Sequence, residues 1–214
     1  ENTRLGIPAL FGGEGLHGFM AQESTYFPQA IALGCTFDPG LVERIYAAAA
    51  VEMRSRGVTQ VLSPVIDLAR DPRWGRTEEC FSEDPYLVSR MGLAAVLGFQ
   101  GHTSEDLKSG KHVIATLKHF VGHGQPEGGR NIAPVAASMR EVREMHMYPF
   151  EVCVKEGNVL SVMASYNDLN GIQNHANKWL LTDVLCGEWG FDGYITAEQA
   201  PSSMATTIAA IYII

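Results

Sequence analysis

The stretch "LKHFVGHGQPEGGRN", residues 117–131, joins a Lys-His pair to a loop that holds four glycines. Lys118 and His119 end an apolar run that is expected to be a strand. Neighbouring side chains on a regular strand point to opposite faces, so both can reach one site only if the strand bulges or ends there. The glycines permit such a backbone, because glycine adopts conformations that other residues avoid. The stretch therefore indicates a binding site for a ligand that needs several nearby hydrogen-bond donors.

The spacing of His119 and His123 also fits two ligands of a metal ion. No third ligand is placed nearby, and the pair is expected on a loop rather than on a helix, so we expect no metal and no cofactor. The four cysteines are widely separated and form no CxxC pattern. They are predicted to be buried or half-buried free thiols: Cys35, Cys80, Cys153 and Cys186.

A second dense stretch, "DLARDPRWGR" at 67–76, holds three arginines, two aspartates and a tryptophan. Pairs between arginine and aspartate are the usual way to order such a loop, and we expect some here. One arginine left for a ligand is plausible, although the spacing does not say which. Trp74 could stack on the face of a sugar or fill the interior of the fold, and the residues leave both open.

Carboxylates and a tyrosine follow other apolar runs. Glu14 in "EGLHG" could accept hydrogen bonds from ligand hydroxyls or lie in solvent, and Tyr166 in "VMASYN" could face a site or be packed. Glu198 ends "GYITAE", and opposite a cluster of Lys, Arg and His it would stay ionised at neutral pH. An ionised carboxylate suits a nucleophile or an electrostatic stabiliser, although a surface glutamate is an equal alternative.

The elements that would position these residues are short apolar runs and amphipathic segments. Six apolar runs are expected to be strands: 7–11, 30–35, 60–68, 112–120, 159–166 and 193–196. Asp38–Pro39 and Asp84–Pro85 start two helices, which we expect to end at Gly57 and near Gly101. Ser138 and Glu141 form a capping box for a helix that runs to Gly157, and a fourth helix covers about 177–186.

Strands that alternate with helices predict a parallel α/β domain. Candidate residues follow nearly every strand, which favours an α/β (β/α)8 barrel of the TIM type over a doubly wound sheet, where they would gather at one point. No GxGxxG pattern follows the first strand. Six strand-helix units are about two fewer than a barrel has, so we expect one incomplete barrel domain over residues 1–214.

The composition excludes several functional classes. Hydrophobic residues make up 46% and charged residues 19% of the chain, as in globular proteins. The net charge of −8 argues against nucleic-acid binding. The sequence has no run of 18 apolar residues, so we expect no membrane span. The first residues, "ENTRLGIP", do not form a signal peptide, and we expect a chain cut at both ends.

Six ordered motifs resemble glycoside hydrolase family 3, the family of β-glucosidases and β-xylosidases. They are "IPALFGGEGLHG", "FPQAIALGCTFDP", "RDPRWGRTEECFSEDPYLVSRMG", "KHFVGHGQPEGGRN", "VMASYND" and "LLTDVLCGEWGFDGYI". The resemblance covers essentially the whole chain. It implies the first, barrel domain of a retaining exo-glycosidase that removes a sugar from a non-reducing end and needs no cofactor. Family members are often secreted or periplasmic.

The resemblance also implies roles for single residues. Glu14 and Arg76 would hold the substrate, Lys118 and His119 would bind hydroxyls of the sugar in the −1 subsite, and Tyr166 and Met163 would lie near the ring. In a retaining glycosidase two carboxylates stand about 5–5.5 Å apart, one as the nucleophile and one as the acid/base. Small oligosaccharides or aryl glycosides would be the substrates.

Two departures from the family pattern bear on activity. The family's nucleophile is an Asp, usually followed by an aromatic residue, whereas this chain has Glu198 followed by Gln199. Glu is one methylene longer, and a shift of about 1 Å can cost about 100-fold in rate. The acid/base usually comes from a following domain, and the D-S-H motif that replaces it in one branch is missing here. We therefore expect an impaired glycosidase, with a catalytically silent carbohydrate binder or an aldolase that uses Lys118 as the alternatives.

Overall fold

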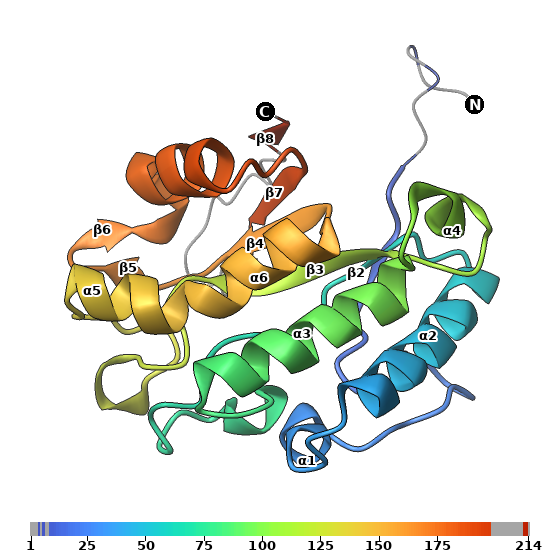
Figure 1. Ribbon diagram of the computed structural model, residues 1–214, viewed down its shortest axis with the longest axis horizontal. Coiled ribbons are helices and arrows are strands. Elements are labelled where there is room, and N and C mark those ends of the chain that lie inside the picture. Colours follow the sequence, from blue (N-terminus) through green and yellow to red (C-terminus); the bar gives the residue numbers. More distant parts are fainter. Residues whose placement is uncertain (1–3, 5, 7–8, 198–211, 214) are drawn as a thin grey trace.

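Five parallel strands form a curled sheet in the computed structural model, which describes residues 4, 6, 9–197 and 212–213 (Figure 1). They are β1 (Gly12–Gly13), β2 (Gln60–Val61), β3 (Ile114–Phe120), β4 (Ser161–Ala164) and β7 (Tyr194–Ala197). The order in the sheet is β1-β2-β3-β4-β7, and β8 (Tyr212–Ile213) pairs antiparallel with β7. The parallel strands lie in the sheet in the same order as in the sequence, which is the arrangement of a (β/α)8 barrel. The predicted incomplete barrel is confirmed.

Helices α2 (Pro39–Ser55), α3 (Pro85–Gln100) and α6 (Tyr148–Gly157) pack side by side over one face of the sheet (Figure 1). The side chain of Asp38 accepts a hydrogen bond from the backbone N–H of Leu41, and Asp84 does the same for Leu87. In both helices proline occupies the first position, where its missing N–H costs nothing. Both predicted helix starts are confirmed.

The predicted helix over 138–157 is present but is not regular. Ser138 accepts a hydrogen bond from the N–H of Glu141 at its start. The helical segment consists of α5 (Met139–Glu141), the π-helical turn η3 (Val142–His146) and α6. The predicted fourth helix is η5 (Trp179–Glu188), also π-helical. The remaining elements are α4 (Ser104–Lys108), the 3₁₀ turns η1 (Thr77–Glu79), η2 (Glu127–Gly129) and η4 (Asn174–Ala176), and a hairpin of β5 (Asp168–Leu169) with β6 (Ile172–Gln173).

One predicted strand is wrong. The run at 30–35 forms helix α1 (Ala30–Gly34) instead. Ala30, Leu33 and Gly34 are the buried residues, and their spacing of three and four is that of one helix face. Gly34 lies so close to Phe81 that a Cβ would come 1.8 Å from the Phe81 carbonyl oxygen. The first strand, expected at 7–11, is found at Gly12–Gly13, with positions 7 and 8 outside the described residues.

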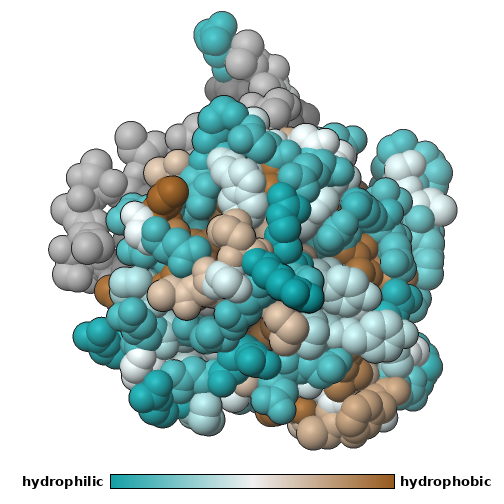
Figure 2. Space-filling model, turned by 60° about the vertical axis from the view of Figure 1, so that its left-hand side comes forward, coloured by the Kyte–Doolittle hydropathy of each residue, from teal (hydrophilic) through white to brown (hydrophobic). Residues whose placement is uncertain are grey.

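The core lies between the sheet and its covering helices. Alternate residues of the regular parts of β2, β3, β4 and β7 belong to this core: Val61, Ala115, Leu117, Val162, Ala164 and Ile195. Phe120, after the irregular part of β3, belongs to it too. The face of the molecule in Figure 2 is mostly hydrophilic, with apolar side chains in separate patches. Among the described helices, none has the length and hydropathy needed to cross a membrane. The four cysteines are free thiols as predicted, although Cys35 is exposed rather than buried.

Candidate active site

The first pair of predicted site residues meets at the carboxyl ends of the strands. Glu14 directly follows β1, and Lys118 lies in β3, with β2 between them in the sheet. The Lys118 Nζ atom is 3.1 Å from Glu14 Oε2 and 3.4 Å from Glu14 Oε1. The lysine side chain is only 5% exposed, whereas that of Glu14 is 45% exposed. The result is a charge-assisted pair whose carboxylate end faces solvent.

The strand is irregular where Lys118 and His119 lie. The pairing of β3 with β4 shifts register between Leu117 and Phe120. The N–H of His119 donates to the side chain of Asp67 at 3.1 Å instead of continuing the ladder. The peptide bonds Lys118–His119 and Phe120–Val121 are cis. The register shift confirms the irregularity predicted from the two adjacent polar residues.

His119 is held from both sides of its ring. Its Nδ1 atom lies 2.7 Å from Asp67 Oδ2, and its Nε2 atom lies 3.0 Å from Arg76 Nη2. A guanidinium can only donate, so Nε2 accepts from Arg76 and Nδ1 carries the proton that goes to Asp67. Burial, with smaller effects of His123 and Arg76, holds the pKa of His119 well below its usual range. The ring is therefore a neutral imidazole of fixed tautomer.

Arg76 is ordered by a bidentate ion pair. Its Nε and Nη2 atoms donate to the two carboxylate oxygens of Glu79 at 2.8 and 2.9 Å. The guanidinium also lies 5.9 Å from the centre of the Trp74 ring. The expected Arg–Asp pair forms earlier in the same loop, where Arg73 Nη2 lies 2.7 Å from Asp71 Oδ2 on the surface. Glu79 was not among the predicted residues, although its spacing of three residues from Arg76 was an available signal.

A second histidine closes the site on the side of the Gly-rich loop. His123 Nε2 and Trp74 Nε1 both lie 2.9 Å from Asn131 Oδ1. An amide oxygen accepts, so His123 carries its proton on Nε2, and burial lowers the pKa of His123 to about 4. Trp74 is 2% exposed and packs with Val65, which decides between its two predicted roles in favour of filling the interior. Asn131 was not among the predicted residues.

The remaining predicted residues lie on or after β4 and β7. The half-buried ring of Tyr166 is 5.9 Å from that of His123, which is itself 4.5 Å from His119. Met163 is 5% exposed and sits in β4, in register with Thr196 of β7. Glu198, the predicted nucleophile, lies outside the described residues.

Asn167, which follows Tyr166, is part of the scaffold rather than of the site. It is fully buried, accepts from Ser165 at 2.7 Å and donates to the Val121 carbonyl. Asn174 donates to the same carbonyl and to Ser165. These amides hold the ends of β3 and β4 together, which fixes the backbone from which His119 and Tyr166 project.

Close packing explains the glycines of the loop. A Cβ on Gly124 would lie 1.9 Å from the Leu68 carbonyl oxygen, and Gly129, at φ 71°, would contact Arg73. The two loops that carry the site, 67–79 and 122–131, therefore approach at backbone distance. Within the described residues no group of three His, Cys, Asp or Glu side chains could hold a metal ion.

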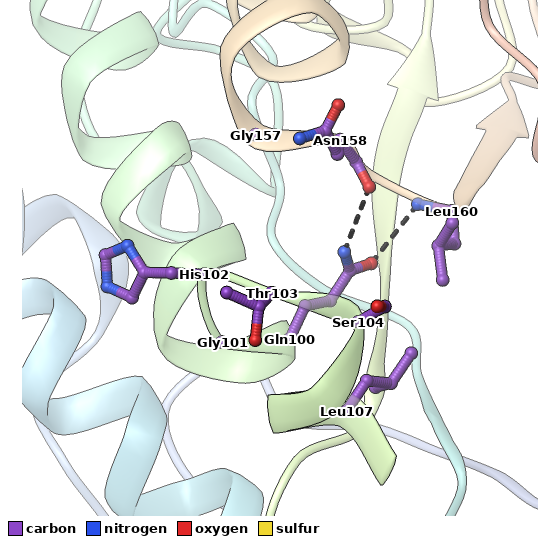
Figure 3. A pocket seen from close by; sticks show the side chains of 9 residues that line it. All are labelled: Gln100, Gly101, His102, Thr103, Ser104, Leu107, Gly157, Asn158 and Leu160. Atoms are coloured by element: carbon purple, nitrogen blue, oxygen red, sulfur yellow. Dashed lines mark hydrogen bonds between the residues drawn. The ribbon is translucent and has the colours of Figure 1, made fainter.

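The pocket in Figure 3 lies at the other end of the sheet. It has a volume of about 150 Å³ and is lined by residues such as Gln100, Thr103 and Leu160, which adjoin the starts of β3 and β4. Chemistry in parallel barrels gathers at the carboxyl ends of the strands. The candidate active site is therefore the cluster around Lys118 and His119, and the pocket is a separate feature.

Comparison with known proteins finds relatives of this chain. The family model described as the glycosyl hydrolase family 3 N terminal domain matches residues 1–211. A β-xylosidase of Formosa agariphila is 46% identical over 204 residues, which are 92% of this chain and 28% of that protein. A β-glucosidase structure from Erythrobacter marinus superposes with a TM-score of 0.89 and 42% identity, covering 92% of this chain and 26% of that one.

A second solved structure carries a ligand. It is a mutant β-glucosidase of Listeria innocua in complex with laminaribiose, with a TM-score of 0.87, 38% identity and coverage of 92% of this chain and 26% of that chain. This chain therefore spans about a quarter of the length of the relatives that it matches.

Proposed function

Because this chain belongs to glycosyl hydrolase family 3, we propose that it supplies the barrel part of an active site that hydrolyses terminal, non-reducing β-glucosides or β-xylosides. Residues 1–214 would be part of the N-terminal barrel domain. Relatives named β-xylosidase and β-glucosidase support both sugars. Glucose and xylose differ by one hydroxymethyl group, so the same hydroxyl-binding residues suit either.

The observation that carries the proposal is the Glu14–Lys118 pair beside the neutral His119. Sugar hydroxyls both donate and accept hydrogen bonds, and here an ammonium donor lies 3.1 Å from a carboxylate acceptor. Two hydroxyls on adjacent ring carbons can use both groups at once. An aldolase would need Lys118 as a neutral amine that attacks a carbonyl. The ion pair with Glu14 instead suits Lys118 as a charged hydrogen-bond donor, which disfavours the aldolase alternative.

The proposed mechanism is a double displacement. Glu198 attacks the anomeric carbon as the glycosidic C–O bond breaks and the leaving oxygen takes a proton from the general acid. Water, deprotonated by the same group, then hydrolyses the glycosyl-enzyme and frees Glu198. Lys118 and Glu14 bind ring hydroxyls, and those contacts tighten as the ring flattens in the transition state. His119, whose two ring nitrogens bond Asp67 and Arg76, holds Arg76 in place beside them. Arg76, Tyr166 and Met163 would lie near the same ring. The general acid/base would come from a domain outside these 214 residues, so the chain alone would be impaired.

An activated substrate tests this without the acid/base. The leaving group of 2,4-dinitrophenyl β-glucoside or β-xyloside departs without protonation, so glycosylation of Glu198 should release up to one equivalent of dinitrophenolate in a burst. Mass spectrometry of the chain treated with a 2-deoxy-2-fluoroglycoside should locate the sugar on Glu198. Glu198→Gln should abolish both signals, while Glu198→Asp, which restores the family's residue, should increase the burst rate.

The second candidate, a catalytically silent carbohydrate binder, is favoured by one observation. Glu198 and Gln199 stand where the family usually has Asp and an aromatic residue. Under this alternative neither the parent chain nor Glu198→Asp gives a burst, whereas titration with glucose or xylose still shows binding. Absence of both the burst and the binding would overturn both candidate functions.

A further inference from the structure

A row of polar side chains lies on the inner, concave face of the sheet. The outward residues of the strands are apolar and pack under the helices, and side chains alternate along a strand. Their neighbours on the inner face are Gln60 of β2, Thr116 of β3, Ser161 of β4 and Thr196 of β7. Gln60 is 7% exposed, and Thr116 and Ser161 are fully buried. Bulky aliphatic residues usually fill this layer of a barrel, so a polar row requires an explanation.

The carboxamide of Gln60 joins the whole row. Its Nε2 atom lies 2.9 Å from the Thr116 hydroxyl, 3.3 Å from that of Ser161 and 3.4 Å from that of Thr196. Ser161 and Thr196 are also 3.0 Å apart. An amide has two hydrogens, so they are shared among three acceptors. One side chain of β2 therefore contacts each of the next three strands in the sheet.

The contact between Gln60 and Thr196 depends on the curvature of the sheet. Two strands, β3 and β4, separate β2 from β7. In a flat sheet three steps of about 4.8 Å would place the two strands about 14 Å apart. Glutamine and threonine cannot bridge that distance, so their hydrogen bond exists only in the curled sheet. This hydrogen bond between Gln60 and Thr196, called the chord below, links β2 to β7 across the arc of the sheet.

Two of the hydroxyls that Gln60 binds precede candidate site positions in their strands. Thr116 is two residues before Lys118, and Thr196 is two residues before position 198 in the sequence. We propose that Gln60 is a positioning residue that, by binding Thr116, Ser161 and Thr196, sets where β7 ends relative to Lys118. This rests on the proposed function in one respect, because the carboxylate that follows β7 matters for catalysis only if Glu198 is the nucleophile.

The test removes the chord at either end. Gln60→Met keeps the length of the side chain, and Thr196→Val keeps its shape, but each deletes the hydrogen bond. The matched control is Gln100→Met. Gln100 is 6% exposed and also makes three hydrogen bonds, but it lies at the opposite end of the sheet. Thr196→Val keeps the test open if Gln60→Met fails to fold.

The first readout is hydrogen exchange of the backbone amides in the full 214-residue chain. Gln60→Met and Thr196→Val should each speed the exchange of the β7 amides of Ile195, Thr196 and Ala197 at least tenfold. Gln100→Met should leave these amides unchanged relative to the parent. Equal effects of all three substitutions on β7, or no effect of the first two, would overturn the positioning role.

The second readout is the burst of dinitrophenolate from the activated glucoside. A displaced nucleophile should slow the burst rate constant about 10- to 100-fold while the glucoside concentration for half-maximal rate changes less than about twofold. The double variant should be no slower than the slower single variant, because both lose the same bond. If the two substitutions slow the burst rate additively, they do not act through the same hydrogen bond, and the proposed role of the chord is wrong. A parent chain without any burst refutes the proposed function alone, and hydrogen exchange then decides the role of Gln60.

Discussion

The Nδ1 atom of His119 lies 2.7 Å from Oδ2 of Asp67, and the side chains of both residues are 1% exposed. The same carboxylate oxygen also accepts the backbone N–H of His119 at 3.1 Å. One oxygen therefore sets the backbone of the irregular strand and the tautomer of the imidazole together. Two variants separate these contributions.

Asp67→Ala should destabilise the fold strongly, because it leaves two buried donors of His119 without an acceptor, at about 1–3 kcal/mol for each. Asp67→Asn should cost less, because an amide oxygen in the same place accepts both bonds. Urea unfolding at pH 7 measures the difference. Asp71→Ala, which breaks the surface pair with Arg73, is the control and should have the smallest effect.

Nitrogen NMR of the imidazole gives a separate check on His119. In the parent chain and in Asp67→Asn, Nδ1 should be protonated and Nε2 unprotonated at pH 7, as the hydrogen bond from Arg76 requires. A protonated Nε2 in the parent would contradict this arrangement.

The ion pair of Lys118 with Glu14 leads to a prediction about sugar binding. Lys118→Met should weaken glucose and xylose binding about 10- to 100-fold, because a charge-assisted hydrogen bond to a ligand contributes about 1.5–3 kcal/mol. Glu14→Gln should weaken it less, because the side chain of Glu14 is 45% exposed and an amide still offers an acceptor. Calorimetric or NMR titration measures both affinities.

Lys155→Met is the matched control for Lys118→Met. Lys155 also pairs with a glutamate, Glu151, but it lies on the outer helix α6. Its replacement should leave sugar affinity unchanged. If both lysine variants bind equally well, Lys118 does not contact the sugar.

The sequence predicted those features of the site that depend on local chemistry. Two adjacent polar residues at the end of an apolar run required an irregular strand, and the register shift beside Lys118 and His119 is that irregularity. Asp38 and Asp84 cap their helices as expected, because capping involves only neighbouring residues. The helix at 30–34 was mistaken for a strand because a short apolar run fits both periods.

The partners that order the site could not be predicted in the same way. Asn131 meets His123 and Trp74 through a contact between two loops, and Asp67 bonds the ring of His119, 52 positions away in the chain. Such pairings depend on how the loops pack. Gln60 was read as part of an apolar run, yet its hydrogen bonds reach residues up to 136 positions away in the chain.

Gln100 at the opposite end of the sheet should control stability without affecting the site. Its Oε1 atom accepts the N–H groups of Ala115 and Leu160, at the starts of β3 and β4, and its Nε2 donates to the carbonyl of Asn158. Figure 3 shows the bonds to Leu160 and Asn158. Gln100→Leu should destabilise the fold by about 1–3 kcal/mol for each buried group left unpaired. Gln100→Glu should retain the two accepted bonds but also destabilise the fold, because a buried carboxylate faces the Asn158 carbonyl in place of a donor.

Thermal and urea unfolding measure the effect at Gln100, and the burst assay with the activated glucoside measures the site. The folded fraction of either Gln100 variant should keep the parental burst rate. A changed burst rate in the folded protein would mean that the two ends of the sheet are coupled.

His146 in the π-helical turn η3 makes stability depend on pH. It is 3% exposed, and burial lowers its pKa to about 4, opposed by Glu141 and assisted by Arg70. The unfolded chain binds a proton on this histidine below about pH 6.5, whereas the folded chain does so only near pH 4. Its contribution is therefore fully present above pH 6.5 and is lost as the pH falls towards 4, by up to about 1.4 kcal/mol per pH unit.

Replacing His146 with leucine removes this titration and places an apolar side chain in the buried position. The free energy of unfolding of His146→Leu should then fall less steeply than that of the parent between pH 6.5 and 4, when both are measured by urea unfolding. Some slope should remain, because burial also lowers the pKa of His119 and of His123. Parallel curves for parent and variant would mean that His146 takes up its proton equally in the folded and unfolded chain, which a neutral, buried imidazole does not allow.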